Sequence, residues 1–286
     1  MTTETTSGSR AHLHGMWSAV AGSWREHADY IDARAAPVTA ELLRLSAPQP
    51  GERVLELACG PGGVGLEAAA LVQPGGDVVL SDVAPEMTAI AAARAAARGL
   101  ANVSTCELDL EQIEQPDGSF DVVLCREGLM FAADSERAAR EIGRVLQPGG
   151  RAAVAVWAAR ERNPWLGVVL TAVSAQLGQP VPPPGVPGPF SLDDPGRLAG
   201  IMTAAGLTDV AVQEVDVPLR AATFDEWMMR TTALAGPLAK RLESLPGDAA
   251  LALRARLEEA VRPYETRAGL EFPGVTLIAS GRRAAQ

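Results

Sequence analysis

Two carboxylates and a cluster of glycines are the residues of this sequence whose types and spacing suit ligand chemistry. Glu56 lies four residues before Gly60, and Gly62 and Gly65 continue the spacing Gly-x-Gly-x-x-Gly. Such glycines allow a tight turn in which the backbone approaches a ligand closely. The spacing alone matches a dinucleotide fingerprint, with Asp82 placed to hold a ribose. Glu56 disfavours that interpretation, because its charge would repel a pyrophosphate and attract a cationic amino acid group.

The stretch around these glycines resembles motif I of the class I S-adenosylmethionine (SAM) methyltransferases, in which an acidic residue and any residue precede Gly-x-Gly-x-Gly. Here it reads Glu56-x-Ala58-x-Gly60-x-Gly62, so alanine replaces the first glycine. The substitution narrows the space over the methionine end of the cofactor. Within the family, the chain most resembles the small-molecule methyltransferases of the ubiquinone/menaquinone-biosynthesis type, through its Trp-bearing N-terminal arm, motif I and the stretch Cys-x-x-Gly-Leu-x-Phe from residue 125.

The resemblance implies a cofactor site with SAM as its ligand. In the family, the acid that ends the second strand holds the ribose hydroxyls, and Asp82 matches that position. Met87 matches an apolar residue near the adenine, Asp109 the acid that takes the adenine amino group, and Leu110 the apolar residue that packs on the ring. The expected cofactor-binding residues are Trp24, Glu56, Ala58, Gly60, Gly62, Asp82, Val83, Met87, Asp109, Leu110 and Arg126.

The catalytic residue is harder to assign. A methyl acceptor must be held in line and away from water, whereas a protein base is optional when the acceptor is an anion or an amine. Family members with a catalytic histidine often carry it shortly after the fourth strand, but residues 129–131 are Leu-Met-Phe here. Glu127 is the nearest ionisable side chain, and we favour a structural or cofactor-amine role for it over that of a general base. Candidate acceptor contacts, with core packing as the alternative, are Met130, Phe131, Trp157 and Trp227.

The elements that must position these residues alternate between strand and helix from residue 51 onward. We predict strands at 54–57, 77–82, 102–108, 120–125, 151–157, 209–219 and 275–280. This alternation predicts a doubly wound, Rossmann-like α/β sheet of seven strands, mostly parallel with an antiparallel last strand, together with a helical cap. Ligands of such sheets bind at the carboxyl ends of the strands, where the candidate residues lie.

The pattern also divides the chain. Two helices are expected before the first strand, the second of them opened by Pro37. The predicted parts are an N-terminal helical arm or lid (1–50), the SAM-binding core (51–160), a cap insertion with a proline-rich loop (161–190), a return to the core (191–222), a helical cap (223–272) and the last core strand (273–286).

Composition bounds the function further. The 286 residues are 47% hydrophobic and 21% charged, as in an ordinary globular protein, and the net charge of −10 argues against a nucleic acid partner. Cys59, Cys106 and Cys125 have no metal-ligand spacing and are interpreted as reduced, buried thiols, so no metal is expected. No apolar run is long enough to cross a bilayer, and residues 1–10 lack a signal-peptide pattern. We therefore expect a cytoplasmic protein.

These observations predict SAM-dependent methyl transfer to a small, largely apolar acceptor at oxygen, carbon or nitrogen. One alternative is a SAM-binding protein that uses the cofactor structurally, for another reaction or interaction. A nicotinamide-dependent oxidoreductase is disfavoured by Glu56 and by the lack of a Tyr-x-x-x-Lys pair, since Lys240 is the only lysine.

Overall fold

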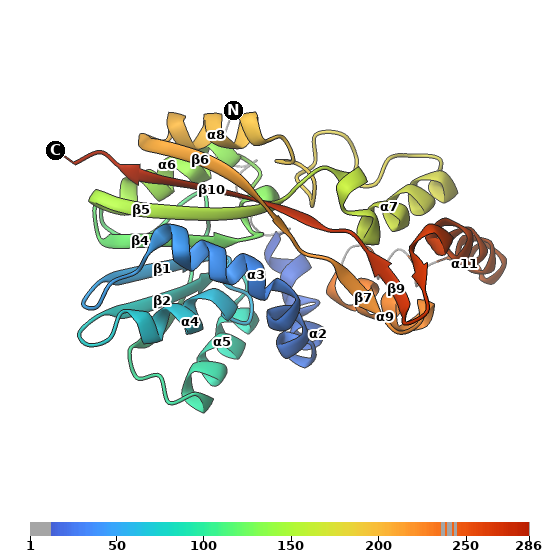
Figure 1. Cartoon of the computed structure of the whole chain (residues 1–286), viewed down its shortest axis with the longest axis horizontal. Helices are drawn as coiled ribbons and strands as arrows, with labels where there is room; N and C mark the ends of the chain where they lie inside the picture. The colour runs from blue at the N-terminus through green and yellow to red at the C-terminus, as the bar shows by residue number, and fades with distance from the viewer. Residues whose placement is uncertain (1–12, 236–237, 239–241, 243–244, 286) are drawn as a thin grey trace.

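The computed structural model describes residues 13–235, 238, 242 and 245–285. Its largest element is a seven-stranded sheet in the order β3-β2-β1-β4-β5-β10-β6 (Figure 1). β10 is antiparallel to β5 and β6, whereas the remaining neighbours are parallel, which confirms the predicted sheet. The strands are β1 (Arg53–Leu57), β2 (Asp77–Asp82), β3 (Val103–Glu107), β4 (Phe120–Arg126), β5 (Leu146–Trp157), β6 (Leu207–Asp216) and β10 (Val275–Arg283).

Helices cover both faces of this sheet, as its apolar strands require. Val54 of β1 faces one helical layer, and Leu55 and Leu57 face the other; all three side chains are fully buried. The first layer contains α3 (Ala28–Ser46), α4 (Gly63–Leu71) and α5 (Pro85–Ala97). The second contains α6 (Ser135–Val145) and α8 (Pro195–Ala204).

A cap with its own hydrophobic core lies beside the carboxyl end of the sheet (Figure 1). Trp227 and Phe272, both fully buried, lie at the centre of this core. The part predicted as a helical cap, residues 223–272, also contains two strands that the sequence analysis did not predict, since β8 and β9 lie there and β9 pairs with β7 and β8 in a small sheet. The cap elements are α7 (Pro164–Leu177), β7 (Leu219–Ala221), α9 (Phe224–Leu234), α11 (Gly247–Val261), β8 (Glu265–Thr266) and β9 (Gly269–Phe272), and short 3-10 turns occupy Leu129–Phe131, Arg160–Arg162 and Arg262–Tyr264.

Two chain segments join the cap to the main sheet as one antiparallel ribbon, made of residues 207–221 and 269–283. Asp216 of β6 pairs with Val275 of β10, and Leu219 of β7 pairs with Phe272 of β9. Between these pairs, the backbone N–H of Val217 donates to the carbonyl of Gly274 at 2.7 Å. The pairing is therefore continuous from the core into the cap.

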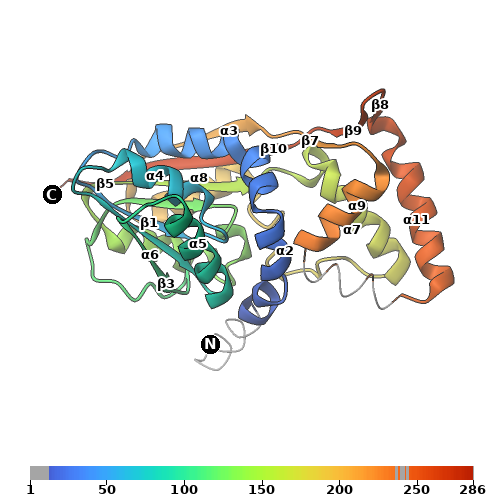
Figure 2. The same ribbon diagram turned by 90° about the horizontal axis from the view of Figure 1, so that it is seen from below.

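The N-terminal arm lies between core and cap. Its α2 (Ala21–Glu26) contacts α5 on one side and α9 on the other (Figure 2). Pro37 does not open a second helix, as the sequence suggested, but lies inside α3. Val38 and Leu42 of α3 are fully buried against the sheet, and this packing outweighs the backbone hydrogen bond that proline removes. The first twelve residues of the predicted arm lie outside the described part of the chain.

Candidate cofactor and acceptor site

The turn after β1 is fastened to the ends of the neighbouring strands. Cys59 donates its backbone N–H to the Ser81 carbonyl at 2.8 Å, and the Gly60 N–H donates to the Asp82 carboxylate at 2.9 Å. The N–H of Leu108 donates to the Asp82 carbonyl at 2.9 Å. These contacts bring the carboxyl ends of β1, β2 and β3 together, and with them most of the predicted cofactor residues.

Two glycines of the turn are needed for close packing. Gly62 has φ +86°, a left-handed conformation that favours glycine, and it caps the N-terminus of α4. A Cβ on Gly65 would lie 2.2 Å from Leu80 and 2.7 Å from the Glu56 carboxylate. Any side chain there would push α4 away from the sheet.

Glu56 lies beneath the turn. Its carboxylate is almost fully buried and accepts a hydrogen bond from the Gly65 N–H at 2.8 Å. Burial raises the pKa of Glu56 to about 7, although the guanidinium of Arg126 acts in the opposite direction. The structure thus gives Glu56 a positioning role under the first turn of α4.

Asp82 lies at the end of β2 with 7% of its surface exposed. Its two carboxylate oxygens accept from the N–H groups of Gly60 and Ala84, and burial raises its pKa to about 6. Val83 follows it half-buried, and Met87 is buried. Just beyond the end of β3, Asp109 accepts from the Glu111 N–H at 2.9 Å, and Leu110 packs against the sheet core.

Ala58, which replaces the first glycine of the motif, fits because a glycine lies opposite it after β4. Ala58 has φ +49°, and a Cβ on Gly128 would lie 2.4 Å from the Ala58 Cβ. Glu127, next to Gly128, also has a positive φ of 60°. The left-handed region costs a residue with a side chain roughly 1–3 kcal/mol, so strained turns after β1 and β4 flank the site.

The arm covers this turn. A Cβ on Gly60 would lie 3.6 Å from the Trp24 ring, and Trp24 donates its indole N–H to the Leu234 carbonyl of α9 at 3.2 Å. Trp17 packs edge-on against Trp24 and against Phe131, with ring centroids 5.8 and 5.1 Å apart. Trp24, predicted at the cofactor, therefore links the arm, the glycine turn and the cap.

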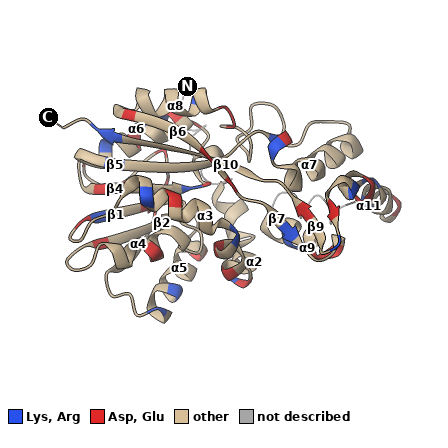
Figure 3. Ribbon diagram, viewed as in Figure 1, with Lys and Arg blue, Asp and Glu red and all other residues tan. Residues whose placement is uncertain are grey.

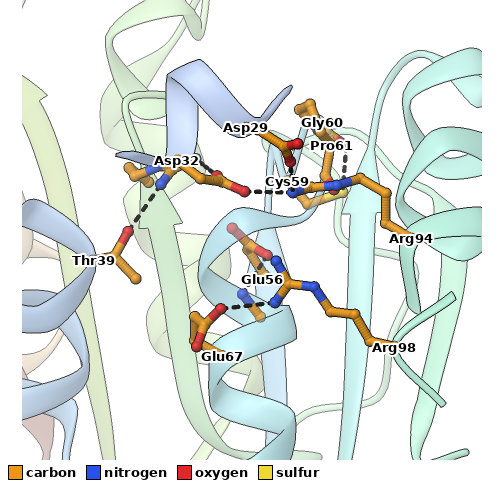
Figure 4. Close-up of polar contacts among 12 residues, drawn as sticks. Asp29, Asp32, Thr39, Glu56, Cys59, Gly60, Pro61, Glu67, Arg94 and Arg98 are labelled. Carbon is orange, nitrogen blue, oxygen red and sulfur yellow. Dashed lines mark hydrogen bonds and ion pairs between the residues drawn. The ribbon is translucent and has the colours of Figure 1, made fainter. Parts of the chain in front are cut away.

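A charged network connects α3 to the same turn (Figure 4). Asp32 accepts from Arg94 at 2.6 Å and from Arg126 at 3.3 Å, while Arg126 donates to the Thr39 hydroxyl at 2.9 Å. Arg94 also donates to the carbonyl of Pro61, which follows Gly60 in the turn. Arg126 was predicted at the cofactor, and its guanidinium is committed to this network.

A cavity of about 80 Å³ lies beside the glycine turn, between the ends of β4 and β5 and the cap. Trp24, Glu127 and Trp157, all predicted for the site, line it. Met130 and Phe131 pack instead against the sheet core, and Trp227 lies in the cap core. The sequence analysis missed several polar lining residues, namely Tyr30, Arg34, Arg230 and Thr231.

The three cysteines are free thiols, and burial raises the pKa of Cys125 to about 12. In the described part of the chain, no three His, Cys, Asp or Glu side chains form a group that could hold a metal ion. Among the same residues, no helix combines the length and the apolarity that a membrane span requires.

The strand order, the antiparallel β10 and the acid-and-glycine turn after β1 define a Rossmann-like protein of the SAM-binding class. Residues 54–150 match the family described as "Methyltransferase domain". Over 196 residues the chain is 34% identical to nocamycin O-methyltransferase of Saccharothrix syringae, covering 65% of this chain and 69% of that protein. The chain belongs to the SAM-dependent methyltransferases.

A second relative agrees with this family, and a solved structure shows a similar fold. The chain is 38% identical over 128 residues to the ubiquinone/menaquinone biosynthesis C-methyltransferase UbiE of Ectopseudomonas mendocina, covering 44% of this chain and 50% of that protein. It thus spans half the length of this relative. The fold is similar to that of the YcgJ protein of Bacillus subtilis, with a TM-score of 0.60 at 20% identity, covering 87% of this chain and 98% of that one.

The residues present fit SAM, the cofactor of this family. Asp82 and Asp109 offer carboxylate acceptors at the ends of neighbouring strands, as a ribose diol and an adenine amine require. Gly60 and Gly62 add no side chains of their own between the backbone of the turn and a ligand. The turn itself contains no arginine or lysine, which a pyrophosphate would favour.

Proposed function

We propose that this methyltransferase transfers the methyl group of SAM to a small molecule bound in the cavity between the sheet and the cap. The observation that carries the proposal is the position of the cavity, because Trp24 lines it and also packs on Gly60 of the cofactor turn. SAM would supply the methyl group there: an electron pair of the acceptor would form the new bond to the methyl carbon, and the electrons of the broken carbon–sulfur bond would return to sulfur, giving S-adenosylhomocysteine (SAH).

Apart from Glu56, which lies under the first turn of α4, and Arg126, which is held by Asp32 and Thr39, the predicted cofactor residues remain our assignment for SAM, with Glu127 near its amino group. Trp157, Trp165 and Leu166 give the acceptor cavity aromatic and apolar walls. Such walls hold a ring or chain in place and exclude water, which favours methyl transfer without a strong protein base. The acceptor atom is oxygen, carbon or nitrogen.

The charge distribution supports a small-molecule acceptor over a nucleic acid. Arginines are scattered among acidic residues over core and cap (Figure 3), and the net charge is −10. Recognition of a phosphate backbone favours a concentrated basic face. The free cysteines support a reducing compartment, and we place the protein in the cytoplasm.

Calorimetry with SAM, SAH and NAD, followed by transfer of a labelled methyl group to a panel of phenols, acids, amines and quinols, tests this proposal. We expect SAM and SAH to bind, NAD not to bind at micromolar concentration, and at least one acceptor to be methylated. Micromolar NAD binding would contradict the cofactor assignment. Tight SAM binding with no methyl transfer across the panel would favour a protein that uses SAM structurally.

A further inference from the structure

Four buried polar atoms without a hydrogen-bond partner belong to side chains that line the same cavity. Among the described residues, the buried side-chain atoms that lack a partner are Tyr30 Oη, Arg34 Nε, Trp157 Nε1 and Thr231 Oγ1, and all four residues line the cavity. Leaving such an atom buried and unpaired destabilises the protein, because the atom has given up its hydrogen bonds to water. Because these four come from the arm, β5 and α9, their convergence points to a ligand that completes their hydrogen bonds.

The bonding capacity of these atoms specifies the ligand. Arg34 Nε and Trp157 Nε1 carry only donor hydrogens, and the hydroxyls of Tyr30 and Thr231 can also donate. A group that only accepts hydrogen bonds, such as an ionised carboxylate, can satisfy all of them. An aliphatic or purely aromatic ligand would leave them unpaired.

The charges in the cavity agree with this polarity. The Arg34 guanidinium stacks 4.2 Å above the Trp165 ring, and no carboxylate of the described chain forms an ion pair with it. Burial lowers the pKa of Arg34, an effect that Glu127 and Tyr30 oppose, and an arginine stays protonated under such conditions. The other cavity arginine, Arg230, pairs with Glu226 at 2.6 Å. Arg34 is thus the cation available to a ligand.

We infer that the methyl acceptor is an organic oxyanion, whose charged oxygens bind Arg34 and its neighbouring donors while its apolar body packs on Trp157 and Trp165. This inference rests on the proposed function. It adds a charged end to the largely apolar acceptor that the sequence suggested. An acceptor that enters as an anion also needs no protein base at the oxygen that attacks, which is consistent with the lack of a histidine after β4.

Among the residues that the structure describes, Glu127 is the one acidic side chain that lines this cavity, and its charge opposes an anion. We place the amino group of the cofactor beside Glu127, where it offsets that charge. The acid-binding test is therefore done with SAH bound, which fills the cofactor site and prevents turnover.

The experiment compares acids with their neutral amides as probes of SAH-saturated protein. The pairs are acetate and acetamide, benzoate and benzamide, and 2-naphthoate and 2-naphthamide, titrated at pH 7.5 by calorimetry. For the pair that fits the cavity, we expect the acid to bind at least about tenfold more tightly than the amide. This comparison in the wild-type protein depends on no variant.

Variants then locate the anion. Arg34→Gln should weaken acid binding by roughly 10- to 100-fold and leave amide binding unchanged, and Arg34→Lys should retain part of the preference. Arg25→Gln, which replaces an exposed arginine of the same arm, should behave as wild type. SAH affinity, measured first in every variant, reports whether the protein is folded.

The outcomes separate the two proposals. If SAH does not bind the wild-type protein, the proposed function fails. If SAH binds but no acid binds, if amides bind as well as acids, or if a folded Arg34→Gln variant keeps the wild-type preference, the oxyanion inference is overturned and the methyltransferase proposal stands.

Discussion

The Asp82 carboxylate accepts hydrogen bonds from the backbone of the glycine turn and, in our assignment, also from the ribose of SAM. Its replacement by alanine removes the acceptor for the Gly60 and Ala84 N–H groups and for the ribose hydroxyls. We expect SAM binding to weaken by about 1.5–3 kcal/mol, as for other hydrogen bonds to a charged group. Calorimetry measures this loss. Asp77→Ala, at the exposed start of the same strand, is the control. If the two folded variants bind SAM with equal affinity, the ribose does not bind at Asp82.

Glu56 should make the free energy of unfolding depend on pH, because its pKa in the folded protein is raised from 4.5 to about 7. Between these values the folded protein binds a proton that the unfolded chain has released, so this residue lowers the free energy of unfolding as pH rises. The full effect is roughly 3 kcal/mol. Glu56→Gln keeps an acceptor for the Gly65 N–H and abolishes this titration.

Urea unfolding at pH 5 and pH 8 measures the effect. We expect the stability of the Gln variant, relative to wild type, to be greater at pH 8 than at pH 5. Asp82, whose pKa is also raised, is present in both proteins and cancels in the comparison. Parallel pH dependences in the two proteins would show that Glu56 is ionised throughout.

Residues in the motif were predictable from their local spacing, whereas the polar residues that α3 contributes to the cavity were not. Gly60, Gly62 and Asp82 lie within a short stretch whose spacing carries the signal. Arg34 and Tyr30 are an isolated arginine and tyrosine on a helix, a pattern that also describes a solvated surface. Their role depends on α9 and β5, which pack beside them from distant parts of the chain.

At the scale of elements, Asp32 connects α3 to α5 and β4. The Arg126 side chain is only 7% exposed, so Asp32→Ala would leave a nearly buried guanidinium without its ion pair. We expect a loss of roughly 2–4 kcal/mol in the free energy of unfolding, most of it the cost of the unpaired charge. Asp29→Ala is the matched control, because the Asp29 carboxylate is fully exposed although it lies 3.6 Å from Arg94.

Urea denaturation of both variants checks this prediction. The control should lose less than about 0.5 kcal/mol, as exposed ion pairs usually do. Equal losses in the two variants would mean that Arg126 finds another partner when Asp32 is removed.

Long elements with a clear pattern were predictable, and short ones paired over long distances were not. Strands such as β1 and β4 are largely apolar runs that follow glycine or proline turns, and β6 alternates between apolar and polar residues, which periodicity detects. β8 and β9 contain two and four residues, and β9 pairs with a β7 that lies far away in sequence. Pro37 misled the prediction because tertiary packing of α3 outweighs local preference.

For the whole molecule, the separate core of the cap predicts separable effects. Trp227 is fully buried and donates its indole N–H to the Trp165 carbonyl, so Trp227→Ala should destabilise the cap by about 3–5 kcal/mol and disturb the acceptor cavity. We expect nearly unchanged SAM binding and loss or alteration of methyl transfer. Titration with SAM and an activity assay on the acceptor found by screening test this together. Loss of SAM binding would show that the cap also holds the cofactor.

The continuous ribbon between core and cap has a consequence for recombination. A cap taken from a relative cannot be joined to this core through a flexible linker. The Val217–Gly274 hydrogen bond and the strand pairs on either side of it fix the alignment of both segments. Slippage of one segment by a single residue would turn every side chain of that segment to the opposite face. Exchange of acceptor specificity by swapping caps therefore requires two crossover points, one in each segment of the ribbon, chosen so that the pairing between the segments keeps its register.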